Sequence, residues 1–200
     1  MPRLEIPELS KSNKNRWGKC NTLTSAYGHG VSTTLLQLTR AYAAIVNGGV
    51  LLDPSILLNS KLNKKRVISK ETSAIMNQML RANVDKKNKT SGSGRKADIS
   101  GYDVLGKTGT AQKPSKKEKG YSKEILNVFA SAFPSKKPKY VLTVLIDEPK
   151  GAPQIWKHSR REAGWNAVYI TGKIIQKIGP SLAINDLDLL NNYASHTKNN

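Results

Sequence analysis

The segment Gly106-Lys-Thr-Gly-Thr-Ala111 places a lysine, two threonine hydroxyls and a glycine in series within a predicted strand. Side chains alternate between the two faces of a strand, so Lys107 and Gly109 share one face while Thr108 and Thr110 share the other. Gly109 leaves room for a ligand's backbone, and a strand edge offers N–H and C=O groups to an extended peptide. The charge of Lys107 and the threonine hydroxyls suit a carboxylate. The segment indicates a strand-edge site for a peptide carboxylate, although these common residues taken alone also fit an ordinary edge strand.

Three strands are predicted in this half of the chain. They run from Tyr102 to Ala111, from Ile125 to Phe133 and from Tyr140 to Ile146. The second connection, Pro134 to Lys139, is short enough for a hairpin, so we expect antiparallel pairing. Three strands make a small sheet for 200 residues, which is a first sign that something is missing.

A buried helix is predicted from about 34 to 46. Thr34 can cap it, and Gln37 stands three residues later, as in a capping box. The apolar residues that recur at helical spacing are Leu35, Leu38, Tyr42 and Ile45. Asn47-Gly-Gly49 is a strong signal for the end of this helix.

Two more helices are predicted. Ser69 can cap one that spans roughly 70 to 83. Its expected apolar face consists of Ile75, Met76, Met79 and Leu80, with the methionines as core filler. The last helix is expected from roughly 164 to 178 and is ended by Gly179-Pro180. Helices and an antiparallel sheet together predict an α+β fold.

The segments between these elements complete the expected organisation. Short extended pieces are predicted at 50–52 and 56–58, a mobile stretch at 85–101 and a polar loop at 152–163. A polar, extended lead-in is expected over residues 1–24, and a polar, frayed tail over residues 181–200. Residues 25–180 are predicted to form the folded part.

The chain is strongly basic, with 33 Lys and Arg against 14 Asp and Glu and a net charge of +19. This charge suits an anionic partner such as nucleic acid, a membrane surface or a cell-wall polymer. The lysines, however, fall in separate tracts at 61–66, 86–89, 113–119 and 136–139. Because each tract lies between apolar segments, we interpret them as solvated loops and expect no specific nucleic-acid site.

Other classes of site have weak support. Cys20 is interpreted as an ordinary free thiol. No Cys/His cluster has metal-ligand spacing, since His29, His158 and His196 are scattered, and we expect no metal and no cofactor. No apolar run approaches the ~20 residues of a membrane span, and residues 1–6 lack a signal sequence. Taken literally, such a polypeptide would stay in the cytoplasm.

Three stretches, in order along the chain, resemble the class B penicillin-binding proteins, particularly the cell-division type. The stretch from Tyr27 to Gly49 is similar to the family's glycine turn and the helix that follows it. The stretch from Gly92 to Gln112 resembles the loop leading into the family's Lys-Thr-Gly strand, and Asn127 to Pro149 resembles its strand pair and acidic-Pro turn. Where the family often has proline near the start of the first helix, this chain has Thr34.

The resemblance implies that residues 25–180 are the C-terminal part of a transpeptidase domain with a partial penicillin-binding/β-lactamase-like fold. It implies a peptidoglycan D,D-transpeptidase of septal cell-wall cross-linking, with the stem peptide and β-lactams as ligands and divisome proteins as partners. The full-length protein would be anchored in the inner membrane with this domain at the periplasmic face.

The resemblance also assigns roles to four residues. Lys107 and Thr108 would hold the substrate carboxylate, Lys107 would support the proton network, and Gly109 would leave room for the substrate. The backbone N–H of Thr110 would form half of an oxyanion hole. Catalytic roles are therefore expected for Lys107 and Thr110, while all four residues bind substrate. His29 is interpreted as a spacer.

The family's other two motifs, Ser-x-x-Lys and Ser-x-Asn, are not found in their expected context. The chain contains no Ser-x-Asn. Ser93-Gly-Arg-Lys96 has the first spacing but lies in a glycine-rich loop, so we interpret it as a coincidence. The nucleophile, its base, the middle motif and the membrane anchor are expected before Met1 in a full-length relative, and the chain alone is expected to be inactive.

Two alternatives remain at this point. The chain could be a basic, non-catalytic module that binds an anionic polymer, which salt-dependent binding would reveal. It could also be an independent domain with unrelated chemistry at Lys107, although the order of the three stretches argues against this.

Overall fold

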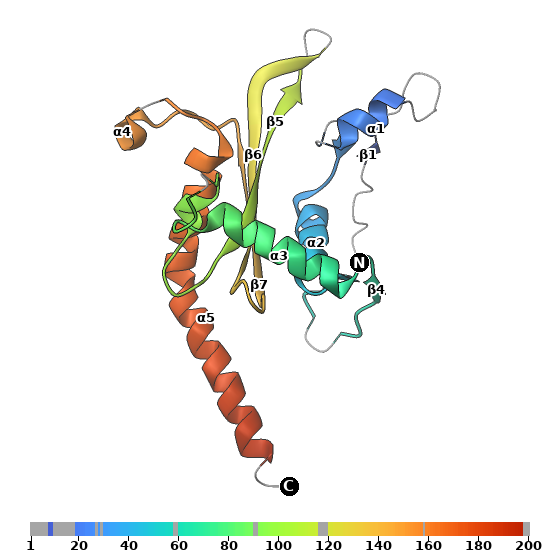
Figure 1. The fold of residues 1–200 in the computed structure, drawn as a ribbon, viewed down its shortest axis with the longest axis vertical. Helices are drawn as coiled ribbons and strands as arrows, with labels where there is room; N and C mark the ends of the chain where they lie inside the picture. Colours follow the sequence, from blue (N-terminus) through green and yellow to red (C-terminus); the bar gives the residue numbers. More distant parts are fainter. Residues whose placement is uncertain are drawn as a thin grey trace.

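The computed structural model describes residues 8–9, 19–26, 28, 30–57, 60–89, 92–115, 120–157 and 159–197. Its centre is an antiparallel sheet of three strands in the order β5-β6-β7, which are Leu105–Pro114, Tyr121–Phe133 and Tyr140–Asp147. Helix α5 covers one face of this sheet, and helix α2 packs on the other (Figure 1). The predicted α+β fold, the three strands and their antiparallel pairing are confirmed.

Each face of the sheet has its own hydrophobic core. On the side of α5, the buried residues are Val84, Ala97, Val104, Phe129, Phe133, Ala163, Ala167, Val168 and Ile175. On the side of α2, they are Tyr42, Val46, Leu80, Leu105, Ala130 and Ala132. Helix α3 contributes Leu80 to one core and Val84 to the other, so it joins the two layers beside β5.

Helix α2, Leu35–Val46, begins and ends where the sequence predicts. Thr34 accepts from the Gln37 N–H, and the Gln37 side chain accepts from the Thr34 N–H, so the capping box is complete. Gly48 and Gly49 both have φ near +90°, which favours glycine after the last turn. At Gly49 a Cβ atom would lie 2.1 Å from the carbonyl oxygen of Ile68, so the chain passes too closely for any larger residue.

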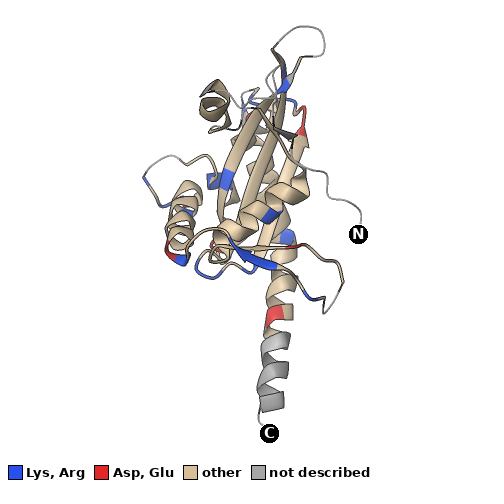
Figure 2. Cartoon of the chain, turned by 90° about the vertical axis from the view of Figure 1, so that its right-hand side faces the viewer, with Lys and Arg blue, Asp and Glu red and all other residues tan. Residues whose placement is uncertain are grey.

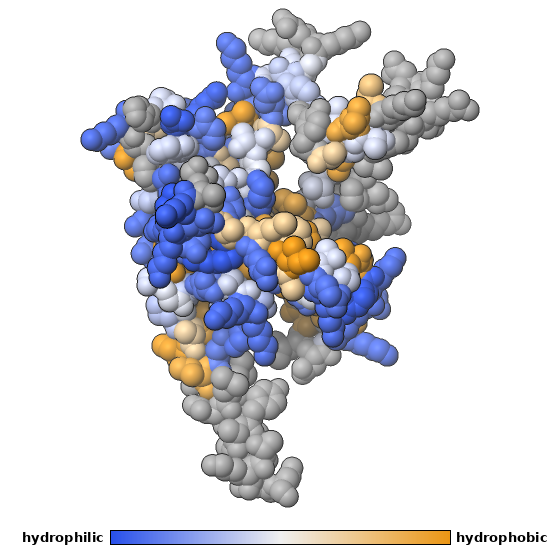
Figure 3. Space-filling model, viewed as in Figure 1, coloured by the Kyte–Doolittle hydropathy of each residue, from blue (hydrophilic) through white to orange (hydrophobic). Residues whose placement is uncertain are grey.

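Helix α3, Lys70–Val84, is capped by Ser69 as predicted, but its predicted apolar face is partly wrong. Ile75 and Met79 are 53% and 63% exposed, so Met79 is not core filler. The buried side chains are Ser73, Leu80 and Val84. Ser73 is polar but buried, because its hydroxyl donates a hydrogen bond to the carbonyl of Ile45. Figure 3 shows the resulting apolar surface patch over α3.

Helix α5, Ala167–Thr197, does not end at Gly179-Pro180, so the predicted end at 178 is wrong. Gly179 serves close packing instead, because a Cβ there would lie 2.3 Å from the ring of Tyr102. Beyond Pro180, Leu182 packs against the core, and Asp186 accepts from the Tyr140 hydroxyl at 3.0 Å. These tertiary contacts continue the helix through the proline and through residues expected to be a frayed tail.

Short elements lie between the main helices and strands, most of them in segments that were expected to lack regular structure. They are α1 (Lys19–Ser25), the strand pairs β1–β2 (Glu8–Leu9, Val31–Ser32) and β3–β4 (Val50–Leu52, Lys64–Arg66), the 3₁₀ turns η1 (Arg95–Ala97) and η2 (Ala163–Trp165), and α4 (Pro153–Trp156). The extended piece predicted at 50–52 is confirmed. The one at 56–58 is wrong, since residues 56–57 form a bend and Leu58 lies outside the described residues. The stretch predicted to be mobile, 85–101, contains η1 and the buried Ala97.

Lysines and arginines are distributed over strands, helices and connections rather than gathered on one element (Figure 2). Among the helices that the structure describes, none has both the length and the apolar character needed to cross a bilayer. In the same residues, no group of His, Cys, Asp and Glu side chains has an arrangement that could hold a metal ion.

The packing of α5 predicts opposite effects for two adjacent substitutions. In Gly179→Ala the new methyl group meets the Tyr102 ring, which is packed edge-on against Phe133. We expect a loss of about 1–2 kcal/mol in the free energy of unfolding, despite the better helix propensity of alanine. Pro180→Ala restores a helix N–H donor and is expected to be neutral or stabilising. Urea unfolding of both variants measures this, and a stabilised Gly179→Ala would contradict the close packing.

Candidate functional site

Strand β5 lies at the edge of the sheet, and its second edge has no strand partner among the described residues. Lys107 pairs with Ala130 and Thr108 pairs with Phe129 on β6. Because directly paired residues share a face of the sheet, Lys107 faces the α2 side and Thr108 faces the α5 side. The predicted alternation is confirmed by this register. Lys107 is exposed, and its Nζ donates to the carbonyl of Thr108 at 3.0 Å.

A pocket of about 430 Å³ opens on the threonine side of β5. Its lining residues are Gly92, Ser93, Arg95, Lys96, Thr108, Thr110, Arg160, Glu162, Ala163, Gly164 and Trp165. Three of these carry a positive charge and one carries a negative charge, so the pocket favours anions. Thr110 Oγ1 accepts from the backbone N–H of Ala163 at 3.3 Å, which ties the strand to the opposite wall.

One pocket cation is held over an aromatic ring. Lys96 Nζ lies 3.8 Å from the centre of the Trp165 ring, as in a cation–π contact. Burial lowers the pKa of Lys96 below its ordinary value. The guanidinium carbon of Arg160 lies 5.4 Å from the centre of the same ring. The indole therefore organises two basic side chains along one wall.

Ser93 is a pocket residue that sequence reasoning missed. Its Oγ lies 2.8 Å from Thr108 Oγ1, across 15 positions of sequence. The interpretation of Ser93-Gly-Arg-Lys96 as a chance match to a nucleophile motif agrees with the geometry: Ser93 lies in a turn, and Lys96 stacks on Trp165. The one signal in the sequence was the glycine on either side of Ser93, which permits a close turn. A second Ser-x-x-Lys match, Ser195 to Lys198, lies where no side chains are described, and His29 lies outside the described residues.

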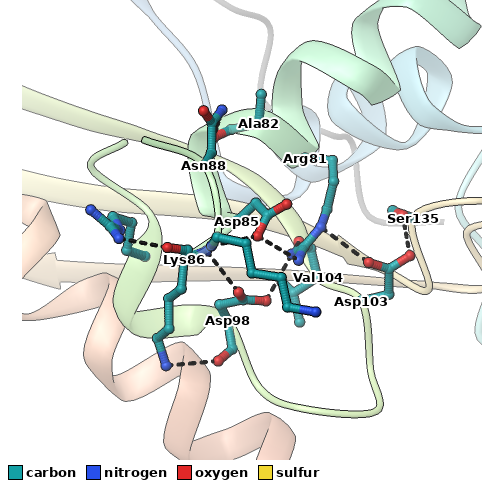
Figure 4. A network of polar contacts seen from close by, with 11 residues as sticks. Arg81, Ala82, Asp85, Lys86, Asn88, Asp98, Asp103, Val104 and Ser135 are labelled. Carbon is teal, nitrogen blue, oxygen red and sulfur yellow. Dashed lines mark hydrogen bonds and ion pairs between the residues drawn. The ribbon is translucent and has the colours of Figure 1, made fainter. Parts of the chain in front are cut away.

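Arg81 of α3 fixes the segment that leads into β5 (Figure 4). Its guanidinium donates to Asp98 Oδ1 at 2.8 Å and to the carbonyl of Val104 at 2.6 Å, and it pairs with Asp103 at 3.0 Å. The Asp103 carboxylate in turn accepts from the hydroxyl of Ser135, in the β6–β7 turn. One side chain thus connects α3, the loop before β5 and the far hairpin.

The charge state of Asp98 depends on this contact. Burial alone raises its pKa, but the hydrogen bonds from Arg81 and from the backbone N–H of Lys86 outweigh burial and hold the pKa below its ordinary value of 3.8. A lowered pKa means that the folded state prefers the carboxylate. The resulting stabilisation is present above pH 3.8 and is lost as the pH falls through the lowered value.

Residues 1–170 match the family model described as the penicillin binding protein transpeptidase domain. The chain is 31% identical to a probable peptidoglycan D,D-transpeptidase FtsI of Caulobacter vibrioides, over 98% of this chain and 34% of that protein. It is 34% identical to the stage V sporulation protein D of Bacillus subtilis, over 84% of this chain and 26% of that protein. The chain therefore spans about a quarter to a third of the length of these curated relatives.

Solved structures agree with this match. The ligand-free crystal structure of penicillin-binding protein 3 from Mycobacterium tuberculosis superposes with a TM-score of 0.70 and 27% identity, covering 88% of this chain and 42% of that one. Its ampicillin complex gives a TM-score of 0.62 and 31% identity, covering 76% of this chain and 36% of that one. The predicted family resemblance and partial fold are confirmed.

The Arg81 contacts predict a pH-dependent stability difference. We expect Arg81→Leu to lower the free energy of unfolding by about 2 kcal/mol at pH 7, because partly buried carboxylates and a carbonyl lose their donor. The difference should narrow as the pH falls below 3.8, since protonated Asp98 needs no cation. Arg161→Leu, at an exposed arginine, is the control. Denaturant unfolding at several pH values measures this, and a difference that is equal at pH 3 and pH 7 would contradict the assignment.

Proposed function

Because the chain belongs to the penicillin-binding protein transpeptidase family, we propose that it supplies the strand of a peptidoglycan D,D-transpeptidase that binds the carboxylate end of the stem peptide. The observation that carries the proposal is the open edge of β5, with Lys107 on one face and the Thr108 and Thr110 hydroxyls on the other. The neighbouring pocket has three cationic residues and one anionic residue in its lining, and this excess of positive charge favours a ligand that ends in a carboxylate.

Each residue of the strand has a part in this proposal. Lys107 provides the positive charge, and the hydroxyls of Thr108 and Thr110 donate to the carboxylate. A Cβ at Gly109 would lie 3.0 Å from the Val128 side chain on β6, so a larger residue would crowd that strand. The missing side chain would also let the ligand backbone approach closely.

The backbone direction supports Thr110 as an oxyanion donor. Asn83 Nδ2 donates to the carbonyl of Gly106 at 2.8 Å from outside the sheet. Alternate residues of a strand direct their backbone groups to the same edge, so the N–H of Thr110 shares the open edge with the carbonyl of Gly106. We assign this N–H to the developing negative charge on the substrate carbonyl oxygen.

The proposed reaction is acyl transfer through a serine. The serine oxygen bonds to the carbonyl carbon of the penultimate D-alanine, the peptide C–N bond breaks, and the terminal D-alanine leaves as an amine that takes a proton. An amine of a neighbouring stem then displaces the serine and forms the cross-link. We assign the nucleophile to none of the described residues, because Ser93 lacks a lysine base within its hydrogen bonds.

The ligands and names of related proteins support a wider proposal for the whole protein. Two of the crystal structures contain ampicillin or aztreonam bound to penicillin-binding protein 3, and we propose that β-lactams bind along the same strand here. We further propose that the whole protein acts in septal cross-linking at the periplasmic face of the inner membrane with divisome partners; the relatives named peptidoglycan D,D-transpeptidase FtsI support the cross-linking activity. The family match favours this function over a basic polymer-binding module.

Carboxylate recognition is tested with a minimal ligand. We expect N-acetyl-D-alanyl-D-alanine to shift the NMR signals of β5 in this chain more strongly than its C-terminal amide does. Lys107→Gln and Thr108→Val should each weaken binding of the acid by about three- to tenfold, the effect of one charged or hydroxyl contact. Lys123→Gln, at an exposed lysine on β6, is the matched control. Equal binding of acid and amide would contradict the proposal.

The covalent step gives a separate prediction. Incubation of the chain with a labelled penicillin should leave its intact mass unchanged, because the Ser93 hydroxyl, which lies beside Thr108, contacts Asn83 and Thr108 and not a lysine base. A full-length relative serves as the positive control for the reagent. A stoichiometric adduct that disappears in Ser93→Ala would show that Ser93 is a nucleophile and would overturn the assignment.

A further inference from the structure

The turn that carries Ser93 is wrapped tightly around Asn83, near the end of α3. The backbone N–H of Ser93 donates to Asn83 Oδ1 at 3.1 Å, and the N–H of Gly94 donates to the Asn83 carbonyl at 3.1 Å. At Gly92 a Cβ atom would lie 2.0 Å from that same carbonyl oxygen, so the turn can approach only with glycine there. The position of Ser93 is thus fixed by backbone contacts as well as by its hydroxyl.

Asn83 also holds the strand itself. Its Nδ2 donates to the carbonyl of Gly106 at 2.8 Å, one residue before Lys107. The amide of Asn83 therefore lies between the turn and the strand, accepting from one with its oxygen and donating to the other with its nitrogen. Ser93 and Thr108 are brought together by this bridge.

The two hydroxyls can be arranged in only a few ways. Ser93 Oγ lies 2.8 Å from Thr108 Oγ1 and 3.3 Å from Asn83 Oδ1. Each hydroxyl has one proton. If Ser93 donates to Asn83, the Thr108 proton can point at Ser93, away from the pocket. If Ser93 donates to Thr108, the Thr108 proton is free to point into the pocket.

We propose that Ser93 is a positioning residue that directs the Thr108 hydroxyl proton toward a bound carboxylate. When the anion binds, Ser93 donates to Thr108 and Thr108 donates to the anion, in a short chain of hydrogen bonds that strengthen one another. The change costs little, because Asn83 Oδ1 gives up the longer 3.3 Å contact and keeps the 3.1 Å bond from the Ser93 N–H. This inference rests on the carboxylate-binding function proposed for β5.

A positioning role predicts energetic coupling, which a merely structural serine would lack. In Ser93→Ala the affinity for N-acetyl-D-alanyl-D-alanine should fall about two- to tenfold, the net value of one hydrogen bond, while affinity for the C-terminal amide stays unchanged. Ser93→Thr keeps the hydroxyl and should retain the preference for the acid. In a Thr108→Val background, Ser93→Ala should have no further effect, because the hydroxyl that it directs is gone.

The experiment is an NMR titration of this chain and the variants Ser93→Ala, Ser93→Thr, Thr108→Val and the Ser93→Ala/Thr108→Val pair. Ser100→Ala, at an exposed serine in a neighbouring turn, is the control, and urea unfolding shows whether each variant is folded. Additive losses in the double variant would overturn the positioning role. So would full affinity in a folded Ser93→Ala variant while the unaltered chain prefers acid over amide. If the unaltered chain shows no such preference, the proposed function itself fails and the positioning role falls with it.

Discussion

The hydrogen bonds of Arg81 are the constraint on which the arrangement around β5 depends. In the part of the chain that the structure describes, β5 pairs with one strand, β6, along one edge, so contacts other than a second strand must fix the point at which β5 begins. The guanidinium does this by joining Asp98, Asp103 and the carbonyl of Val104, one residue before the strand begins. Because arginine presents several donors in a rigid plane, it can satisfy these groups at once in a way that lysine cannot. Two residues further along α3, Asn83 continues the same function at Gly106.

An open strand edge is a liability in a folded protein, since it can pair with other chains. Among the described residues, the edge is held in place by side chains of α3 and not by another strand, so the N–H and C=O groups beyond Gly106 have no strand partner there. The closeness of the packing explains the glycines here. At Gly106 itself, a Cβ would lie 2.4 Å from the Phe129 ring, so β5 sits directly on the aromatic core of the α5 side. The rigid core beneath the strand and the tethers beside it together preorganise a surface that faces no strand partner among the described residues.

The elements that the sequence predicted well are those with local signals. The capping box of Thr34 and Gln37, the cap at Ser69 and the three strands depend on residues within a few positions of one another. The predictions failed where distant contacts prevailed: Gly179 packs on Tyr102 rather than ending α5. The proposed site residues Lys107 to Thr110 could be predicted because the motif is contiguous. The role proposed for Ser93 could not be predicted, because it depends on a contact across 15 residues that Asn83 creates.

The edge position also resolves an apparent conflict in the motif. Lys107 and Thr108 lie on opposite faces of the sheet, with α2 on one side and α5 on the other. In a central strand such side chains could never contact one ligand, because the sheet would separate them. At an open edge, a peptide that adds beside β5 lies in the plane between the two faces and can be reached from both. The lysine charge and the threonine hydroxyls can then act on one carboxylate from two directions. Because the side chains of β5 alternate between the two faces, they can contact one ligand only if the strand lies at an edge of the sheet. In the middle of a sheet, the same four residues would form two separate surfaces.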